Sequence, residues 1–249
     1  MDTPCIPEDH ELRGESIAHI NTVFTESKIT LVCDRDLMEI DIKPLLDNPD
    51  GISESLIRLR ESIIATILVC DWNVRSWALL ESMRGRKNIH FLCRNNEVVQ
   101  LKKILEMVCQ YGSIDLAILF LSSQHMLPAV KHEIEAQYFP ARDTLEEVTQ
   151  GFIPIQEATC LLGNRHASRE DDDIVIWSLL TGAKPYYNAR ELWCDRINTS
   201  SQSINTGFLL SSVPRLCGVK GLSWAPRQPT FHSSPNSVST TKTYQAYDG

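Results

Sequence analysis

The amino-acid sequence predicts an α/β fold, in which helices alternate with short apolar strands. Apolar residues at helical spacing over 11–27 lead directly into the β-rich run 28–33. A second strand-like run covers residues 88–93, and helical spacing follows over 97–111. Because strands that bury apolar side chains need a covering layer, we expect a sheet with flanking helices.

The length and composition indicate a folded protein with a sizeable core. The chain has 249 residues, of which 43% are hydrophobic and 22% are charged, enough for one large or two small domains. Its formal net charge of -8 argues against general electrostatic binding to nucleic acid or anionic lipid. We therefore expect no nucleic-acid partner.

The sequence predicts neither a membrane span nor a secretory signal. The apolar run 116–121 is far shorter than the ~20 residues that a bilayer span requires. The first residues, 1–5, have neither the basic region nor the apolar region of a signal peptide. A cytoplasmic location is therefore the expectation.

Two further helices are expected in the first half of the chain. Turn residues over 44–51 precede the first of them. The apolar face of this helix carries Leu56, Leu59, Ile63 and Ile67. Asp71 is expected to cap a second helix over 72–83, with Gly85 just past its last turn.

The next part of the chain is expected to be helical. Residues 114–122 form an apolar helical run that predicts burial, and helical spacing returns over 155–164 and 173–180. The acidic block 170–173 stands directly before the last of these helices. Carboxylates in this position favour capping and interaction with the helix dipole, and a metal site is the alternative.

The C-terminal part is expected to be irregular. It is rich in Ser, Thr, Asn and Pro, and its strand-like runs at 206–210 and 221–224 are short. Residues 231–239 contain few apolar side chains. We therefore divide the chain into a domain at 1–185 and a C-terminal extension at 186–249 with short strands.

Several catalytic motifs are absent from the sequence. It has no P-loop, no G-x-G-x-x-G, no G-x-S-x-G and no H-E-x-x-H pattern, so several large enzyme classes lose support. The eight cysteines include no C-x-x-C pair and are expected to be reduced, mostly buried thiols. His125 and His132 lie seven residues apart, a spacing that does not indicate a metal site. We predict no bound metal.

One carboxylate is expected on the apolar face of a helix. At about 100° per residue, Glu81 falls between Val74 and Trp77 on the helix predicted after Asp71. Such a carboxylate must either form an interaction with a partner or be desolvated, which raises its pKa. Both conditions are common where a carboxylate acts in catalysis. The alternative is a structural ion pair with one of three nearby arginines, Arg75, Arg84 or Arg86.

Short segments along most of the chain carry a family resemblance. In sequence order they are DTPCIP (2–7), LVCDRDL (31–37), DWNVRSWALLE (71–81) and IHF (89–91), followed by 165–168, 172–180 and 214–226. Together they resemble the fungal heterokaryon incompatibility (HET) domain. In that family a W-I-D-x-L-C-I segment, a helix and a strand precede an R-x-W-T-x-Q-E segment and another strand.

The resemblance implies a module of fungal allorecognition and innate immunity. Such modules trigger programmed cell death when unlike individuals fuse, which implies protein partners and self-association. The HET domain is also remotely similar to the Toll/interleukin-1 receptor (TIR) domain. We therefore expect a partial flavodoxin-like parallel sheet and a role in cell-death signalling, mainly through protein interaction.

The same resemblance gives Glu81 a candidate catalytic role. In TIR enzymes a glutamate on a Trp-containing helix helps to cleave the bond between nicotinamide and ribose in NAD, and Glu81 matches its position. A preorganised carboxylate would stabilise the oxocarbenium character of that reaction. Trp77, one turn earlier, either packs in the core, which we favour, or lines the nicotinamide pocket. The alternative function is an NAD glycohydrolase (NAD+ nucleosidase), with NAD as substrate and no cofactor.

Two departures from the HET pattern lead to a second alternative. Leu80 stands where the family usually has Gln before the Glu. The sequence starts at the segment that matches D-x-L-C-I, without the upstream strand that carries S-Y-x-W-G, so the domain at 1–185 is expected to be N-terminally incomplete. An inactive, marginally folded copy is the second alternative.

Overall fold

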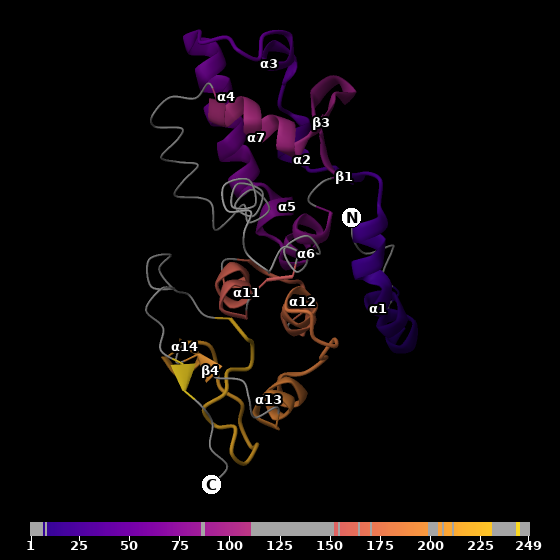
Figure 1. The fold of residues 1–249 in the computed structure, drawn as a ribbon, viewed down its shortest axis with the longest axis vertical. Coiled ribbons are helices and arrows are strands. Elements are labelled where there is room, and N and C mark those ends of the chain that lie inside the picture. Colours follow the sequence, from indigo (N-terminus) through magenta and orange to yellow (C-terminus); the bar gives the residue numbers. More distant parts are fainter. Residues whose placement is uncertain are drawn as a thin grey trace, which may run out of the picture. The chain divides into compact units, whose positions relative to one another are not determined.

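Figure 1 shows the fold of the protein in a computed structural model. The structure describes residues 7, 9–85, 88–110, 152–153, 155–163, 165–169, 171–198, 204–205, 207–210, 212–230 and 243–244. The chain divides into two compact units. The sheet unit comprises residues 20–150, and the helical unit comprises residues 1–19 and 151–249. The boundary between them falls inside helix α1 (His10–Glu26), and the division after residue 185 stays a prediction.

The sheet unit contains a three-stranded sheet. Its strands, in spatial order, are β1 (Thr30–Val32), β2 (Ile89–Leu92) and β3 (Val98–Gln100). Strand β1 runs parallel to β2, with Thr30 beside Ile89, and β3 runs antiparallel to β2, with Gln100 beside His90. The α/β class and the first two predicted strands are thus confirmed. The sheet is mixed, because within the described residues only β1 and β2 pair in parallel.

Strand β3 replaces the start of a predicted helix. The sequence predicts a helix over 97–111, but α7 covers Leu101–Gln110, and the residues before it return beside β2. Asn95 and Asn96 reverse the chain with left-handed backbone angles, φ being 61° and 63°. The predicted start was wrong because the two asparagines form a tight turn that sets Val98–Gln100 against β2.

The helices of the sheet unit cover the sheet and one another. They are α2 (Arg35–Met38), α3 (Lys43–Asp47), α4 (Glu54–Val69), α5 (Asp71–Val74), α6 (Ser76–Arg84) and α7. The predicted apolar face of α4 contributes to the core. Arg60, on the same helix, is fully buried and donates hydrogen bonds to the carbonyl oxygens of Pro49 (2.6 Å) and Gly51 (2.7 Å). These bonds fix the turn that leads into α4.

One face of the sheet is buried, and the other is half-buried at β2 and partly exposed at β1 and β3. On the buried face, Val32, Phe91 and Val99 form one core with side chains of α4 and α7, which contact each other (Figure 1). Because side chains alternate along a strand, Leu31 and Val98 lie on the opposite face. They are 48% and 49% exposed.

The helix predicted after Asp71 is in fact two helices. Arg75 adopts extended backbone angles, φ −84° and ψ 140°, and separates α5 from α6. The N-cap prediction for Asp71 was wrong, because Asp71 lies inside α5 and the Trp72 N–H is instead bound by the Asp34 carboxylate at 2.9 Å. That acceptor lies 38 residues earlier in the chain, where local sequence patterns do not find it. Gly85 ends α6, as predicted.

The helical unit is built around α12. Its elements are α11 (Ile155–Leu162), α12 (Asp172–Leu180), α13 (Ala189–Asn198), α14 (Gly207–Leu210) and the antiparallel strands β4 (Ile204–Asn205) and β5 (Thr243–Tyr244). Helices α11 and α12 confirm two predictions from the sequence. Every residue of α12 is buried, and Trp177 donates an indole hydrogen bond of 3.0 Å to the Thr159 hydroxyl on α11. This bond satisfies both buried polar groups.

The strands predicted over 206–210 and 221–224 were wrong. Residues 207–210 form α14, and the second segment is a turn. Both segments pack on α13 through Trp193, whose ring centroid lies 4.9 Å from that of Phe208 and 5.5 Å from that of Trp224. Aromatic contacts between segments far apart in the sequence thus prevail over the local strand pattern.

Two further predictions concern membrane spans and the burial of the cysteine thiols. No helix in this part of the chain is long and apolar enough to cross a membrane. Cys70 and Cys93 are buried free thiols, as predicted, whereas Cys33 and Cys217 are exposed. Burial raises the pKa of Cys70 to about 12 and that of Cys93 to about 11, so both remain protonated at neutral pH.

Candidate functional site

The candidate catalytic residue Glu81 is half-buried in the second half of α6. Its Oε2 atom accepts a hydrogen bond of 2.9 Å from the indole Nε1–H of Trp72 on α5. The expectation that this carboxylate needs a partner is therefore met by an indole that sequence reasoning did not consider.

Trp72 connects Glu81 to the sheet. The side chain is 5% exposed, and its ring contacts the Phe91 ring of β2 edge-on, with centroids 5.5 Å apart and planes at 75°. The apolar part of the indole thus packs in the core, and its N–H lies at the edge of the core, where it donates a hydrogen bond to the Glu81 carboxylate. The backbone N–H of the same residue donates to Asp34.

Asp34 follows the carboxyl end of β1 and is 6% exposed. Its Oδ1 atom accepts from the N–H groups of Asp36 (2.9 Å) and Leu37 (3.4 Å), which caps α2. Its Oδ2 atom accepts from the Trp72 N–H at 2.9 Å. Three backbone donors thus satisfy one buried carboxylate, as its burial requires.

We refer to these residues as the Asp34–Trp72–Glu81 chain. Through two direct contacts it joins the end of β1 to α5 and α6. In open α/β sheets, ligands bind outside the carboxyl ends of parallel strands, and Asp34 lies at that end of β1. The arrangement holds a carboxylate in a defined orientation. Sequence reasoning missed Asp34, although an Asp between a strand and a short helix is an N-cap signal.

Two other residues that the sequence analysis named, Trp77 and Arg84, lie with Glu81 on α6. Trp77 lies one turn earlier on α6 and is half-buried, so its predicted role in the core or in a pocket wall stays a prediction. Arg84 is buried, and its Nε–H donates to the Asn21 side-chain oxygen at 3.1 Å. Arg86 lies outside the described residues.

The three aspartates of the acidic block at the start of α12 differ in their contacts. Asp171 precedes the helix but makes no side-chain capping hydrogen bond. Asp172 forms an ion pair of 2.6 Å with Arg13 of α1, and Asp173 accepts a long hydrogen bond of 3.5 Å from Gln228. The capping prediction is thus wrong for Asp171, because its backbone has helical angles that turn the side chain away from the first N–H groups.

The structure gives no support for a metal site within the residues it describes. There, no three or more His, Cys, Asp or Glu side chains are grouped so that they could hold a metal ion. The first residue of the acidic block, Glu170, and both His125 and His132 lie outside the described residues.

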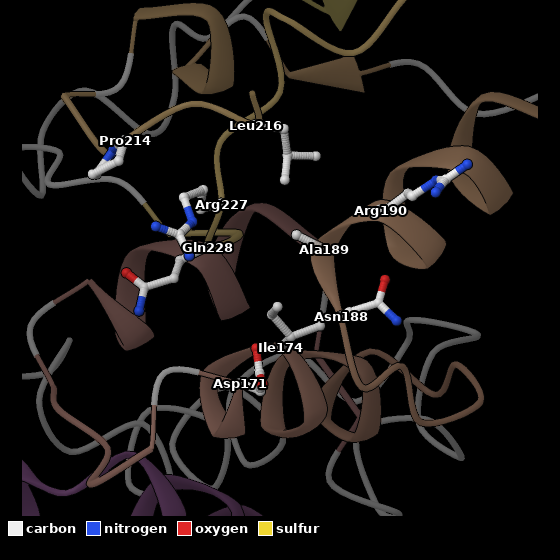
Figure 2. A pocket seen from close by; sticks show the side chains of 9 residues that line it. All are labelled: Asp171, Ile174, Asn188, Ala189, Arg190, Pro214, Leu216, Arg227 and Gln228. Atoms are coloured by element: carbon white, nitrogen blue, oxygen red, sulfur yellow. The ribbon is translucent and has the colours of Figure 1, made fainter. Parts of the chain in front are cut away.

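A cavity of about 260 Å³ lies in the helical unit (Figure 2). Its lining residues come from the first turn of α12, the start of α13 and the segment that follows α14: Asp171, Ile174, Asn188, Ala189, Arg190, Pro214, Leu216, Arg227 and Gln228. Glu81 and Trp77 are not among them. Sequence reasoning missed this cavity because its walls come from three separate segments without a shared motif.

The chain was compared with protein-family models, with curated proteins and with solved structures. No family model, no curated protein and no solved structure matches it.

Proposed function

We propose that this chain is a HET-type module for self/non-self recognition and programmed cell death signalling in the fungal cytoplasm, acting mainly through protein interaction. The supporting observation is the Asp34–Trp72–Glu81 chain. Three of the segments that resemble the HET domain, at 31–37, 71–81 and 89–91, meet there through hydrogen bonds and the Trp72–Phe91 contact. Segments that belong to one domain pattern are expected to meet in space in this way.

The partly exposed face of the sheet supports the interaction role. Leu31 and Val98 are large apolar side chains that are about half exposed on that face. Leu31 on β1 and Val98 on β3 share this face on either side of the half-buried His90 and Leu92 of β2, and exposed apolar surface on a sheet can bind another protein. A flavodoxin-like fold for the sheet unit is part of the proposal, and the parallel pairing of β1 with β2 supports it.

Expression in yeast tests the proposal. The proposed module slows growth or kills the cells while cellular NAD stays constant, and Glu81→Ala leaves this effect in place. Leu31→Lys weakens the effect, whereas the matched change Ile52→Lys, at a residue that is 76% exposed elsewhere in the chain, does not. Normal growth of cells that contain the folded protein contradicts the proposal and favours an inactive copy.

A second candidate function is an NAD glycohydrolase that uses Glu81. The observation that favours it is the half-buried Glu81 carboxylate, which the Trp72 indole holds in place. A carboxylate fixed before reaction stabilises developing positive charge on the ribose without reorganisation. Trp77 would then line the nicotinamide pocket. This function predicts NAD loss that disappears in Glu81→Gln but persists in Glu54→Ala, a change at an exposed carboxylate of α4.

A further inference from the structure

The cavity of the helical unit is small and half open to solvent. Sites for drug-sized ligands usually have volumes of about 300–1,000 Å³. The cavity, at about 260 Å³, suits a smaller molecule of roughly amino-acid size. The proposed signalling function makes no use of this cavity.

The cavity has an acidic group on one wall. The Asp171 side chain points into it from the start of α12 (Figure 2). Its carboxylate is exposed and makes no capping hydrogen bond, while its backbone carbonyl accepts from the N–H groups of Ile174 and Val175, both at 3.2 Å. The backbone therefore holds the carboxylate at the cavity, where it can bind an ammonium group.

A basic group lies on another wall. Figure 2 shows Arg227 and Gln228 side by side, while the side chain of Arg190 points away from the other labelled residues. The backbone N–H of Arg227 donates a hydrogen bond of 2.7 Å to the backbone carbonyl of Pro214. This bond connects two of the segments that line the cavity. A guanidinium is the side chain best suited to bind a carboxylate, because it offers two parallel N–H donors.

Apolar side chains line the cavity beside the two charged groups. Ile174 and Ala189 are 2% and 7% exposed, and Leu216 lines the cavity from the opposite side (Figure 2). These residues would remove an aliphatic side chain of a ligand from water.

We propose that this cavity binds a small zwitterion with an aliphatic side chain, of the kind that a free α-amino acid such as leucine represents. Asp171 binds the ammonium group, Arg227 binds the carboxylate, and Ile174 and Leu216 contact the side chain. The binding site does not depend on the proposed signalling role.

Calorimetric titration of the full chain with three related probes tests this site. Leucine carries both charges, leucinamide lacks the carboxylate, and 4-methylpentanoate lacks the ammonium group. We expect saturable binding of leucine, and dissociation constants at least about tenfold higher for the other two, because each loses one charge-assisted interaction.

Substitutions separate the two charged contacts. Asp171→Asn removes the preference for leucine over 4-methylpentanoate, and Arg227→Gln removes the preference for leucine over leucinamide. Arg169→Gln is the matched control and leaves both preferences intact, because this exposed arginine is not among the residues that line the cavity. All three residues are exposed, so each variant is expected to unfold at the temperature of the parent chain.

Two results would overturn the proposal. One is the absence of saturable leucine binding to the folded chain. The other is leucine binding whose preferences survive both Asp171→Asn and Arg227→Gln, which would place the ligand elsewhere.

Discussion

Asp34 and Asp171 each directly precede a helix and behave in opposite ways. Asp34, before α2, has extended backbone angles, φ −98° and ψ 138°, and its carboxylate accepts from the N–H groups of Asp36 and Leu37. Asp171, before α12, has helical angles, φ −80° and ψ −15°, and caps nothing. Asp34 is buried, whereas Asp171 is exposed beside a cavity.

The difference shows that residue type and position do not by themselves decide the role of a carboxylate. A capping residue needs extended backbone angles so that its side chain can reach the first free N–H groups of the helix. Asp34 has them and also binds Trp72, so it is a structural residue. Asp171 lacks them, which leaves its carboxylate for other partners.

The largest expected effect follows from removal of the Asp34 carboxylate. Asp34→Ala leaves three backbone N–H groups without their acceptor, two of them buried, and we expect a loss of about 2–4 kcal/mol in the free energy of unfolding. Asp34→Asn keeps one acceptor oxygen and is expected to cost less. Urea denaturation measures both values, and a loss below about 1 kcal/mol for the alanine variant would contradict the structural role.

A pH effect is expected at the start of α5, where Cys70 lies near Asp34. Burial, with a smaller contribution from the Asp34 charge, raises the pKa of Cys70 from 9.0 to about 12. The folded state therefore keeps a proton that the unfolded state loses, so this contribution to stability is complete below pH 9 and decreases as the pH rises toward 12.

Unfolding curves recorded between pH 8 and pH 11 test this effect. Cys70→Ala is expected to flatten the alkaline decrease in stability, whereas Cys217→Ala, at an exposed thiol, is expected to leave it unchanged. Equal pH dependence in the parent chain and in Cys70→Ala would rule out the contribution from Cys70.

A moderate effect is expected from Trp72→Phe. The variant keeps an aromatic ring against Phe91 but loses the indole hydrogen bond to Glu81 and some core volume. We expect the free energy of unfolding to fall by about 1–2 kcal/mol in urea denaturation. An unchanged value would show that the bond adds nothing to stability.

The smallest effect is expected at Asp171. Because its carboxylate is exposed and caps no helix, Asp171→Ala should change the free energy of unfolding by less than about 0.5 kcal/mol. The same urea titration measures it beside Asp34→Ala. Equal losses for the two variants would remove the distinction between the two aspartates.

The sequence predicts those parts of the fold that depend on local patterns. The strands that include Thr30 and Ile89 follow from β-rich runs, and α4 and α12 follow from helical spacing. The acceptor for the Trp72 N–H, at the start of α5, could not be predicted, because Asp34 lies 38 residues away in the chain. Where turns and tertiary contacts decide, local patterns are insufficient.

The candidate site was predicted only in part. Glu81 was singled out because it was expected on the apolar face of a helix, and this expectation was wrong: Trp77 and Glu81 are the residues of α6 that are not buried. The carboxylate nevertheless has a partner, the Trp72 indole. The identity of that partner depends on the angle between α5 and α6, which helical periodicity does not contain. The cavity beside Asp171 depends on contacts between three segments, so no local pattern indicates it.

The most direct test of the central claim is a double-mutant cycle between Trp72 and Glu81. The free energies of unfolding of the parent chain, Trp72→Phe, Glu81→Ala and the double variant give the coupling between the two side chains. The hydrogen bond of 2.9 Å predicts a coupling of about 1 kcal/mol. Strictly additive losses would contradict the Asp34–Trp72–Glu81 chain as the unit that joins the end of β1 to α5 and α6.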